Sequence, residues 1–119
     1  MNDNATTRML DELRGRQLSA VTFVMSYLQL SFDGPCINVT NPLTVRTPTI
    51  EVRSWNPGFR DALCAQISKI VTSVGLIPEA LTIRFMDGSL LAVSLLEEDY
   101  TGPEAIYAHG FEDKGWLVI

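Results

Sequence analysis

Apolar and polar residues alternate with a period of two over most of the chain, and this alternation predicts β-strands. In the first half the alternating apolar positions are Val21, Phe23, Met25, Leu28, Leu30, Phe32, Ile37 and Val39. In the second half strands are expected over Ile70–Ile77, Leu81–Met86, Leu90–Leu96 and Trp116–Ile119. An Asp-Gly dipeptide, typical of tight hairpin turns, occurs at 33–34 and again at 87–88. The pattern therefore predicts an α+β fold built mainly of antiparallel β-hairpins and meanders.

Two short helices interrupt this alternation. The first is expected from about Ala5 to Arg14, and the second over about 57–69. The second has the clearer start, because Asn56 is a favoured N-cap residue and proline at the next position lacks only an N–H that would be unpaired anyway. One further helical turn is expected from Gly102-Pro103 through Tyr107.

The two halves of the chain repeat one another at a constant spacing. A displacement of 53 residues aligns Leu18 with Val71, Val21 with Val74, Leu28 with Leu81, Leu30 with Ile83 and Phe32 with Phe85. One inserted residue, Met86, then brings the two Asp-Gly turns together. The three-residue step from Leu18 to Val21 recurs from Val71 to Val74, which predicts a β-bulge or a late strand start in each half. We expect a duplicated unit, a helix followed by a three-stranded meander, over about 5–53 and 57–119; the alternative is that two amphipathic hairpins look alike without common origin.

Several of these motifs resemble those of other proteins. A leading helix, the V-x-x-V and L-x-L-x-F spacings followed by Asp-Gly, and the later G-P-E-A resemble small bacterial α+β proteins of uncharacterised function, over roughly residues 13–108. The resemblance implies a fold but no activity, and it carries over no site residues. In size and class, such acidic α+β proteins are also similar to immunity proteins that neutralise toxins.

Length and composition favour one domain spanning residues 1–119. No stretch approaches the ~20 apolar residues that span a bilayer, and the polar, acidic start lacks the basic region of a secretory signal. We therefore expect a cytoplasmic protein that does not enter a membrane. Cys36 and Cys64 are expected to be small, reduced, buried side chains, because disulfides are rare in that compartment.

Charge is distributed unevenly along the chain. The net charge is −5, yet residues 1–84 are nearly balanced, and almost all of the excess acid lies in the final segment. The acidic residues of that segment are Asp87, Glu97, Glu98, Asp99, Glu104, Glu112 and Asp113, against Lys114 alone. Nucleic acid and anionic membranes are unlikely partners, because both require a basic face. The acidic segment predicts either a contact surface for a basic protein or a solubility feature.

Residues that could carry chemistry are few. His109 is the only histidine, and no serine or cysteine motif accompanies it, so we expect no catalytic residues and no enzymatic activity. Glu97, Glu98, Asp99 and Glu104 lack the alternating spacing of a calcium loop, and one His with two distant Cys makes a poor zinc site. The sequence therefore predicts neither a metal site nor a cofactor.

The leading hypothesis is a non-catalytic interaction module, possibly an immunity-type toxin neutraliser, whose acidic C-terminal third meets a basic partner. Trp55 and Tyr100 are the candidate anchors, although a Trp closing the end of a sheet is the simpler explanation of Trp55. The alternative is a small-ligand binder or minor enzyme, with His109, Tyr100 and Glu104 in a pocket between helices and sheet. Pro48 predicts that segment 43–53 is an edge strand or a bent one, and its unpaired backbone groups predict a homodimer.

Overall fold

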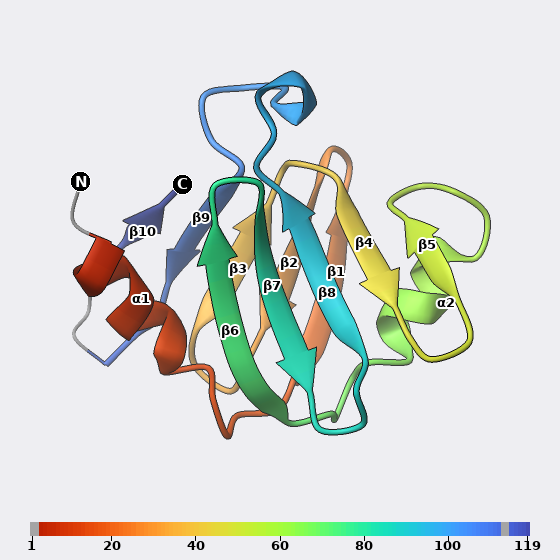
Figure 1. The fold of residues 1–119 in the computed structure, drawn as a ribbon, viewed down its shortest axis with the longest axis horizontal. Helices are drawn as coiled ribbons and strands as arrows, with labels where there is room; N and C mark the ends of the chain where they lie inside the picture. Colours follow the sequence, from red (N-terminus) through yellow and green to blue (C-terminus); the bar gives the residue numbers. More distant parts are fainter. Residues whose placement is uncertain (1–2, 113–114) are drawn as a thin grey trace.

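A computed structural model describes residues 3–112 and 115–119, which form two five-stranded antiparallel sheets packed face to face (Figure 1). The first sheet contains, in spatial order, β1 (Ala20–Val24), β2 (Tyr27–Ser31), β3 (Cys36–Val39), β9 (Ile106–His109) and β10 (Leu117–Val118). The second contains β5 (Glu51–Arg53), β4 (Leu43–Arg46), β8 (Leu90–Ser94), β7 (Ala80–Phe85) and β6 (Val71–Ile77). The helices are α1 (Asp3–Asp11), α2 (Phe59–Cys64) and a 3-10 turn (Glu97–Asp99). The α+β prediction, with antiparallel sheets dominant, is confirmed.

Each sheet combines strands from both halves of the chain. The meander β1-β2-β3 is extended by the later strands β9 and β10, whereas β6-β7-β8 is extended by the earlier strands β4 and β5. After its meander, each half therefore sends its last two strands into the opposite sheet. The sandwich cannot be divided into two independent units, because both sheets need both halves.

The two meanders have the same pairing register. Equivalent pairs at a spacing of 53 or 54 residues are Val21↔Leu30 with Val74↔Ile83, Phe23↔Leu28 with Leu76↔Leu81, and Leu28↔Val39 with Leu81↔Val93. An isolated antiparallel bridge joins Gln17 to Ile70, which are themselves 53 residues apart. Equivalent positions thus face each other where the two halves meet.

The turns and irregularities also follow the sequence pattern. Phe32 N–H donates to Pro35 O across a two-residue turn, and Phe85 N–H donates to Ser89 O across a turn one residue longer, both at 2.8 Å. The register shifts between Val71 and Ser73, as a β-bulge requires. In the first half β1 begins late, at Ala20. The three-residue spacing predicted a bulge or a late start as a feature shared by both halves, but the structure has a bulge in one half and a late start in the other, so this backbone feature is not shared.

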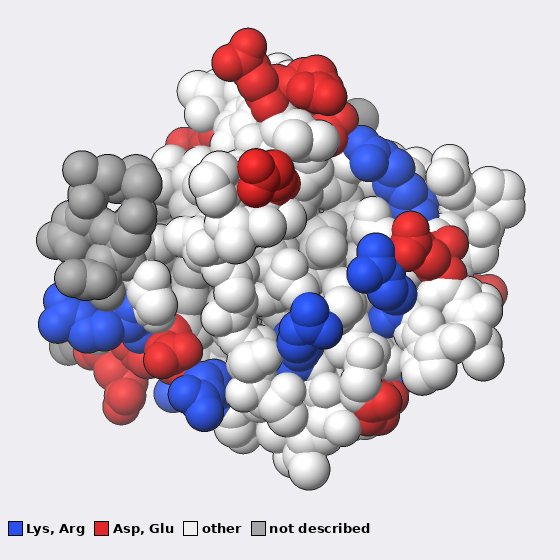
Figure 2. Space-filling model, viewed as in Figure 1, with Lys and Arg blue, Asp and Glu red and all other residues white. Residues whose placement is uncertain are grey.

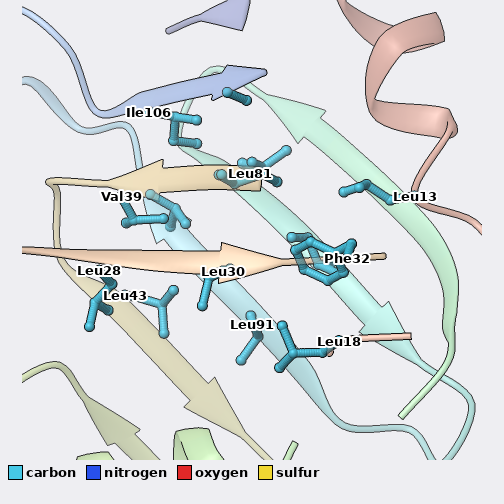
Figure 3. Close-up of a cluster of buried hydrophobic side chains, with 14 of the residues drawn as sticks. Leu13, Leu18, Leu28, Leu30, Phe32, Val39, Leu43, Leu81, Leu91 and Ile106 are labelled. Carbon is cyan, nitrogen blue, oxygen red and sulfur yellow. The ribbon is translucent and has the colours of Figure 1, made fainter. Parts of the chain in front are cut away.

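The core lies between the sheets and collects the inward side of every alternating strand (Figure 3). Phe32 and Phe85 are both buried, as predicted. The helices add Leu10 and Leu63, which are again 53 residues apart. Helix α1 contacts β6, and α2 contacts β4 and β5, so the two helices pack at different margins of the sandwich.

The second helix is shorter than its sequence pattern predicts. It starts after Gly58, which has φ of 87°, and it ends at Cys64, so the predicted start at 57 and end at 69 are both wrong. Ser68 adopts a left-handed φ of 80°, and Ile70 leaves the helical pattern to bridge Gln17. Contact with the other half of the chain therefore overrides the helical spacing.

The helical turn predicted through Tyr107 is wrong. Residues 106–109 form β9, with Ile106 and Ala108 buried and their neighbours outward. Pairing with β3 on one side and β10 on the other supplies the backbone hydrogen bonds that a local turn would otherwise make.

Segment 43–53 is a hairpin rather than one strand. Pro48 lies in the turn between β4 and β5. Strand β4 is interior, because it pairs with β8 as well as β5, and of these two strands only β5 lies at an edge. The prediction of a single edge or bent strand is therefore wrong for the segment as a whole, because the chain reverses at Pro48 and only its second strand is at the edge.

Candidate functional site

The outer faces of the two sheets differ in charge. None of the residues in the five strands of the first sheet is Asp, Glu, Lys or Arg. The strands of the second sheet carry Arg46, Glu51, Arg53 and Arg84, and basic side chains are visible over that face in Figure 2. Because outward strand positions are usually charged or strongly polar, an uncharged outer face is the more informative of the two.

Polar and aromatic side chains occupy the outer face of the first sheet. We call this surface the polar face; it comprises Tyr27, Gln29, Asn38, Tyr107 and His109. Gln29, Asn38 and Tyr107 lie directly opposite one another on β2, β3 and β9. Asn38 Nδ2 donates to Tyr107 O at 3.0 Å, which links β3 to β9 from the outside. These five residues line a hollow of about 380 Å³ together with Thr40 and Glu104.

An aromatic cluster borders the polar face. Trp116 stacks on Tyr107 with ring centroids 5.0 Å apart and planes 29° apart, and its centroid is 5.5 Å from that of His109. Trp116 remains 63% exposed. One end of the polar face is therefore an aromatic platform open to solvent.

A second aromatic group lies where the β5–α2 loop meets β1. We call it the Trp55 corner; it comprises Phe23, Met25, Trp55, Phe59 and Arg60. Trp55 makes edge contacts with Phe23 and Phe59, at centroid distances of 6.4 and 5.6 Å. The Arg60 guanidinium lies 5.5 Å from the Phe23 ring and 5.8 Å from the Trp55 ring, within range of a cation–π interaction. Trp55 is 50% exposed, and Met25 in the adjacent hairpin turn is fully exposed.

A second hollow connects the Trp55 corner to the polar face. It measures about 370 Å³, and its lining includes Ser26, Thr40, Asn41, Trp55 and Thr101. Thr40 lines both hollows, so the two surfaces adjoin. The Asn41 side chain is buried. Its Nδ2 donates a hydrogen bond to Ser94 O at 2.9 Å, whereas its Oδ1 has no partner in the described chain.

The acidic 3-10 turn is held beside the Trp55 corner. Asp99 accepts hydrogen bonds from Ser94 Oγ at 2.5 Å and Arg53 Nη2 at 3.0 Å, and Arg53 also lines the second hollow. The Ser94 hydroxyl, followed by the Arg53 guanidinium, holds the pKa of Asp99 below its usual value. Glu97 and Glu98 are exposed, and within the described residues neither forms an ion pair. Figure 2 shows acidic side chains gathered at this end.

The structure separates the predicted acidic surface into parts. Asp87 lies in the β7–β8 turn, at the end of the sandwich away from the 3-10 turn, and pairs with Lys69 at 2.6 Å. Glu112 N–H donates to Glu12 Oε1, near α1. Asp113 and Lys114 lie outside the described residues. The acidic third of the chain therefore does not form one continuous face among the described residues.

The predicted site residues fall into three places. Trp55, Glu97, Glu98 and Asp99 share the end of the molecule that carries the second hollow, whereas Glu104 and His109 line the first. Tyr100 is partly buried against the core. The hollow that holds His109 lies on the outer face of a sheet, not between helices and sheet, and Tyr100 does not line it.

Sequence reasoning missed most of the polar face. Tyr27, Gln29 and Asn38 are outward polar positions of predicted strands, which the alternation distinguishes only from the core. Tyr107 falls in the segment predicted as a helical turn, and Trp116 is predicted only as part of a terminal strand. The available signal was the absence of charge at these outward positions, but it becomes visible only once the strands are known to be neighbours.

The two cysteines are free thiols, but neither is buried as predicted: Cys36 is partly exposed and Cys64 is exposed at the end of α2. Cys36 lies directly opposite His109 on β3 and β9. Among the described residues no three His, Cys, Asp or Glu side chains gather as metal ligands. In the same part of the chain, no helix has the length and apolar character to cross a membrane.

Comparison with known proteins adds no family. No protein-family model, curated protein or solved structure matches the chain. The resemblance to small bacterial α+β proteins stays a prediction.

Proposed function

We propose that the chain is a non-catalytic protein-binding module whose partner docks on the Trp55 corner. The observation that carries this proposal is a half-exposed Trp55 that contacts Phe23, with Arg60 over its ring and the fully exposed Met25 two residues after Phe23. Trp, Met and Arg are enriched at protein interfaces, and Trp and Arg dominate the residues whose loss weakens binding most. A basic toxin neutralised by binding is the most concrete partner class.

The backbone at Trp55 supports a binding role. Its φ of 70° is left-handed, a conformation that is costly for a bulky residue. This backbone conformation does not bury the indole, because Trp55 remains half exposed. Such local strain is found more often at binding and catalytic sites than elsewhere.

The charge of the neighbouring turn defines the partner. Glu97 and Glu98 lie on the 3-10 turn that the Arg53–Asp99 ion pair links to the β5 strand next to Trp55. Their negative charges favour a partner with basic residues around an apolar centre. Exposed charges of this kind mainly raise the association rate, whereas the buried anchor sets the dissociation rate.

The test begins with a partner that copurifies with the tagged protein, whose binding is then measured by surface plasmon resonance. Trp55→Ala should raise Kd by at least about tenfold, chiefly through faster dissociation. Glu97→Gln/Glu98→Gln should slow association severalfold at low salt and have little effect at high salt, where the Debye length falls to about 3 Å. Asp99 is left intact because it holds the turn in place.

Arg84→Ala, on the outer face of the second sheet and outside the Trp55 corner, is the matched control and should leave binding unchanged. If Trp55→Ala leaves the affinity for the partner unchanged, the proposed docking site is wrong. An association rate insensitive to both salt and the double substitution would leave the acidic turn as a solubility feature.

We further propose that the two halves arose by duplication. The proposal is supported by the shared registers at a spacing of 53 or 54 residues, the Gln17↔Ile70 bridge between equivalent positions, and the reciprocal exchange of the last two strands. An ancestral half-length chain could have formed the same sandwich as a strand-exchanged homodimer, because such exchange is a low-cost route to two-fold assembly.

A further inference from the structure

The polar face carries polar groups that the fold itself does not use. Within the described chain, Tyr27, Gln29 and His109 make no side-chain hydrogen bond, and neither does the Tyr107 hydroxyl. Asn38 lines the hollow and is 9% exposed, and its Nδ2 is already bonded to Tyr107 O. Its Oδ1 has no protein partner among the described residues and is not sealed from solvent, so it can accept a hydrogen bond from water or from a ligand.

The aromatic platform supplies the apolar part of the site. Tyr107 lines the hollow, and Trp116 stacks on it while keeping most of its own surface open. A ring with an apolar face could lie against these side chains. Tyr27, Gln29, Asn38, Tyr107 and His109 come from three adjacent strands, β2, β3 and β9, so the sheet holds them in place. Trp116 directly precedes β10.

The charge of the hollow limits the class of ligand. Among the described residues no Lys or Arg lines it, and Glu104 is the one acidic residue of that lining. Phosphorylated or sulfated ligands would find none of the Lys or Arg side chains that usually pair with them, which disfavours nucleotides and sulfated glycans. Glu104 and Asn38 Oδ1 can accept hydrogen bonds, whereas Gln29, Tyr27 and Tyr107 can donate and accept them. The hollow therefore suits a neutral ligand rich in hydroxyl groups.

We infer that the polar face is a binding site for a neutral saccharide. A pyranose ring combines an apolar C–H face, which Tyr107 and Trp116 would stack against, with hydroxyls that Asn38, Gln29 and Glu104 would bind. The volume of about 380 Å³ lies within the range of small-ligand sites, about 300–1,000 Å³. The site adjoins the Trp55 corner but shares none of its residues, so it does not depend on the proposed protein partner.

Trp116 provides a direct reporter of binding. The chain has two Trp residues, so Trp55→Phe leaves Trp116 as the sole indole. This variant is titrated with neutral oligosaccharides of glucose, mannose, galactose and N-acetylglucosamine, each to about 10 mM, a range that detects dissociation constants of millimolar and below. We expect a saturable change in Trp116 fluorescence with at least one of these sugars, and none with heparin oligosaccharides or glucose 6-phosphate.

Substitutions then locate the site on the sheet. In the Trp55→Phe background, Tyr107→Ala and Asn38→Ala should each weaken binding by about tenfold or more, since each removes a ring or an acceptor. Thr82→Ala, on the outer face of the other sheet, is the control and should change nothing. Tyr107→Phe keeps the ring and the fold. A smaller loss of affinity for Tyr107→Phe than for Tyr107→Ala would separate the contribution of the hydroxyl from that of the stacking surface.

Several results would overturn the inference. Failure of every neutral saccharide to bind would do so, as would binding that survives Asn38→Ala and both Tyr107 variants. Preference for the sulfated or phosphorylated probes would contradict the charge argument. Protection of Tyr107 and Trp116 by a protein partner, with no sugar bound, would assign the polar face to a protein interface instead.

Discussion

Gly110 shows how a single residue position supports the site next to it. It has a φ of 87°, and a Cβ added there would collide with the carbonyl oxygen of Gly34. Glycine is therefore required both by conformation and by space. The close approach packs the end of β9, next to His109, against the 33–35 turn.

Replacement of Gly110 should be costly. Gly110→Ala is expected to lower the free energy of unfolding by at least about 2 kcal/mol, because it adds left-handed strain to a backbone collision. Urea denaturation measures the change. Gly102→Ala is the control, since a Cβ at Gly102 meets nothing within 4 Å. Equal stability of the two variants would show that the 33–35 turn can move away.

Asp87 makes stability depend on acid pH. Its ion pair with Lys69, followed by the backbone N–H of Ser89, lowers the pKa of Asp87 from 3.8 to about 2. A carboxyl whose folded pKa is depressed stabilises the protein above pH 3.8, and this contribution is lost as the pH falls from about 4 toward 2. Because the side chain is half exposed, the contribution should be below about 1 kcal/mol.

Asp87→Asn tests this pH dependence. The variant should be slightly less stable than the wild type at pH 7, and the difference should shrink as the pH falls from 4 to 2. Thermal unfolding at several pH values in low salt measures it. Glu79→Gln, at an exposed position in the β6–β7 turn, should not change the slope. A constant difference at all pH values would assign the effect to packing instead.

At the scale of elements, the two central hairpins should contribute equally to stability. Phe85 ends β7, Phe32 directly follows β2 at the equivalent position, and both are buried in one core. Phe→Ala at either position should cost about 3–5 kcal/mol, the usual range for a buried ring. Chemical denaturation of both variants gives the comparison. Met86→Ala, at an exposed position next to Phe85, should stay within about 0.5 kcal/mol of the wild type.

A marked inequality between the two Phe variants would weaken the proposed duplication, since equivalent positions would then have unequal packing. A loss below about 1 kcal/mol at either position would contradict the burial of that ring.

At the scale of the molecule, sheet edges remain to be covered. Strand β6 is an edge of seven residues without a charged side chain, and Ile77 at its end is 56% exposed. Long uncharged edges favour pairing with another chain. We therefore retain the prediction of a homodimer and place its contact on β6 rather than on segment 43–53.

Light scattering at tens of micromolar should report a dimer for the wild type and a monomer for Ile77→Lys, because a lysine at the edge opposes strand pairing. Ile50→Lys, in the β4–β5 turn with a similar exposure of 48%, is the control and should remain dimeric. A monomeric wild type would refute the prediction.

The sequence by itself determined most of the local structure. Period-two alternation located the strands of both meanders, and the Asp-Gly turns with the inserted Met86 placed their hairpins correctly. The spacing from Leu18 to Val21 and from Val71 to Val74 predicted an irregularity in each half but not that its form differs, a late start in the first and a bulge in the second. These features are local, because turn chemistry and the inward face of a strand depend on residues a few positions apart.

Only the tertiary structure decided which sheet each hairpin joins and which outward side chains meet. Asn38 and Tyr107 bond across 69 residues, and Trp55 meets Phe23 across 32 positions of sequence. Pairing with β3 turned residues 106–109 into a strand, and the Gln17 bridge ended the pattern of the second helix. Long-range pairing satisfies backbone groups that local patterns leave open, and it leaves no periodic signal in the sequence. The polar face and the Trp55 corner are products of that pairing.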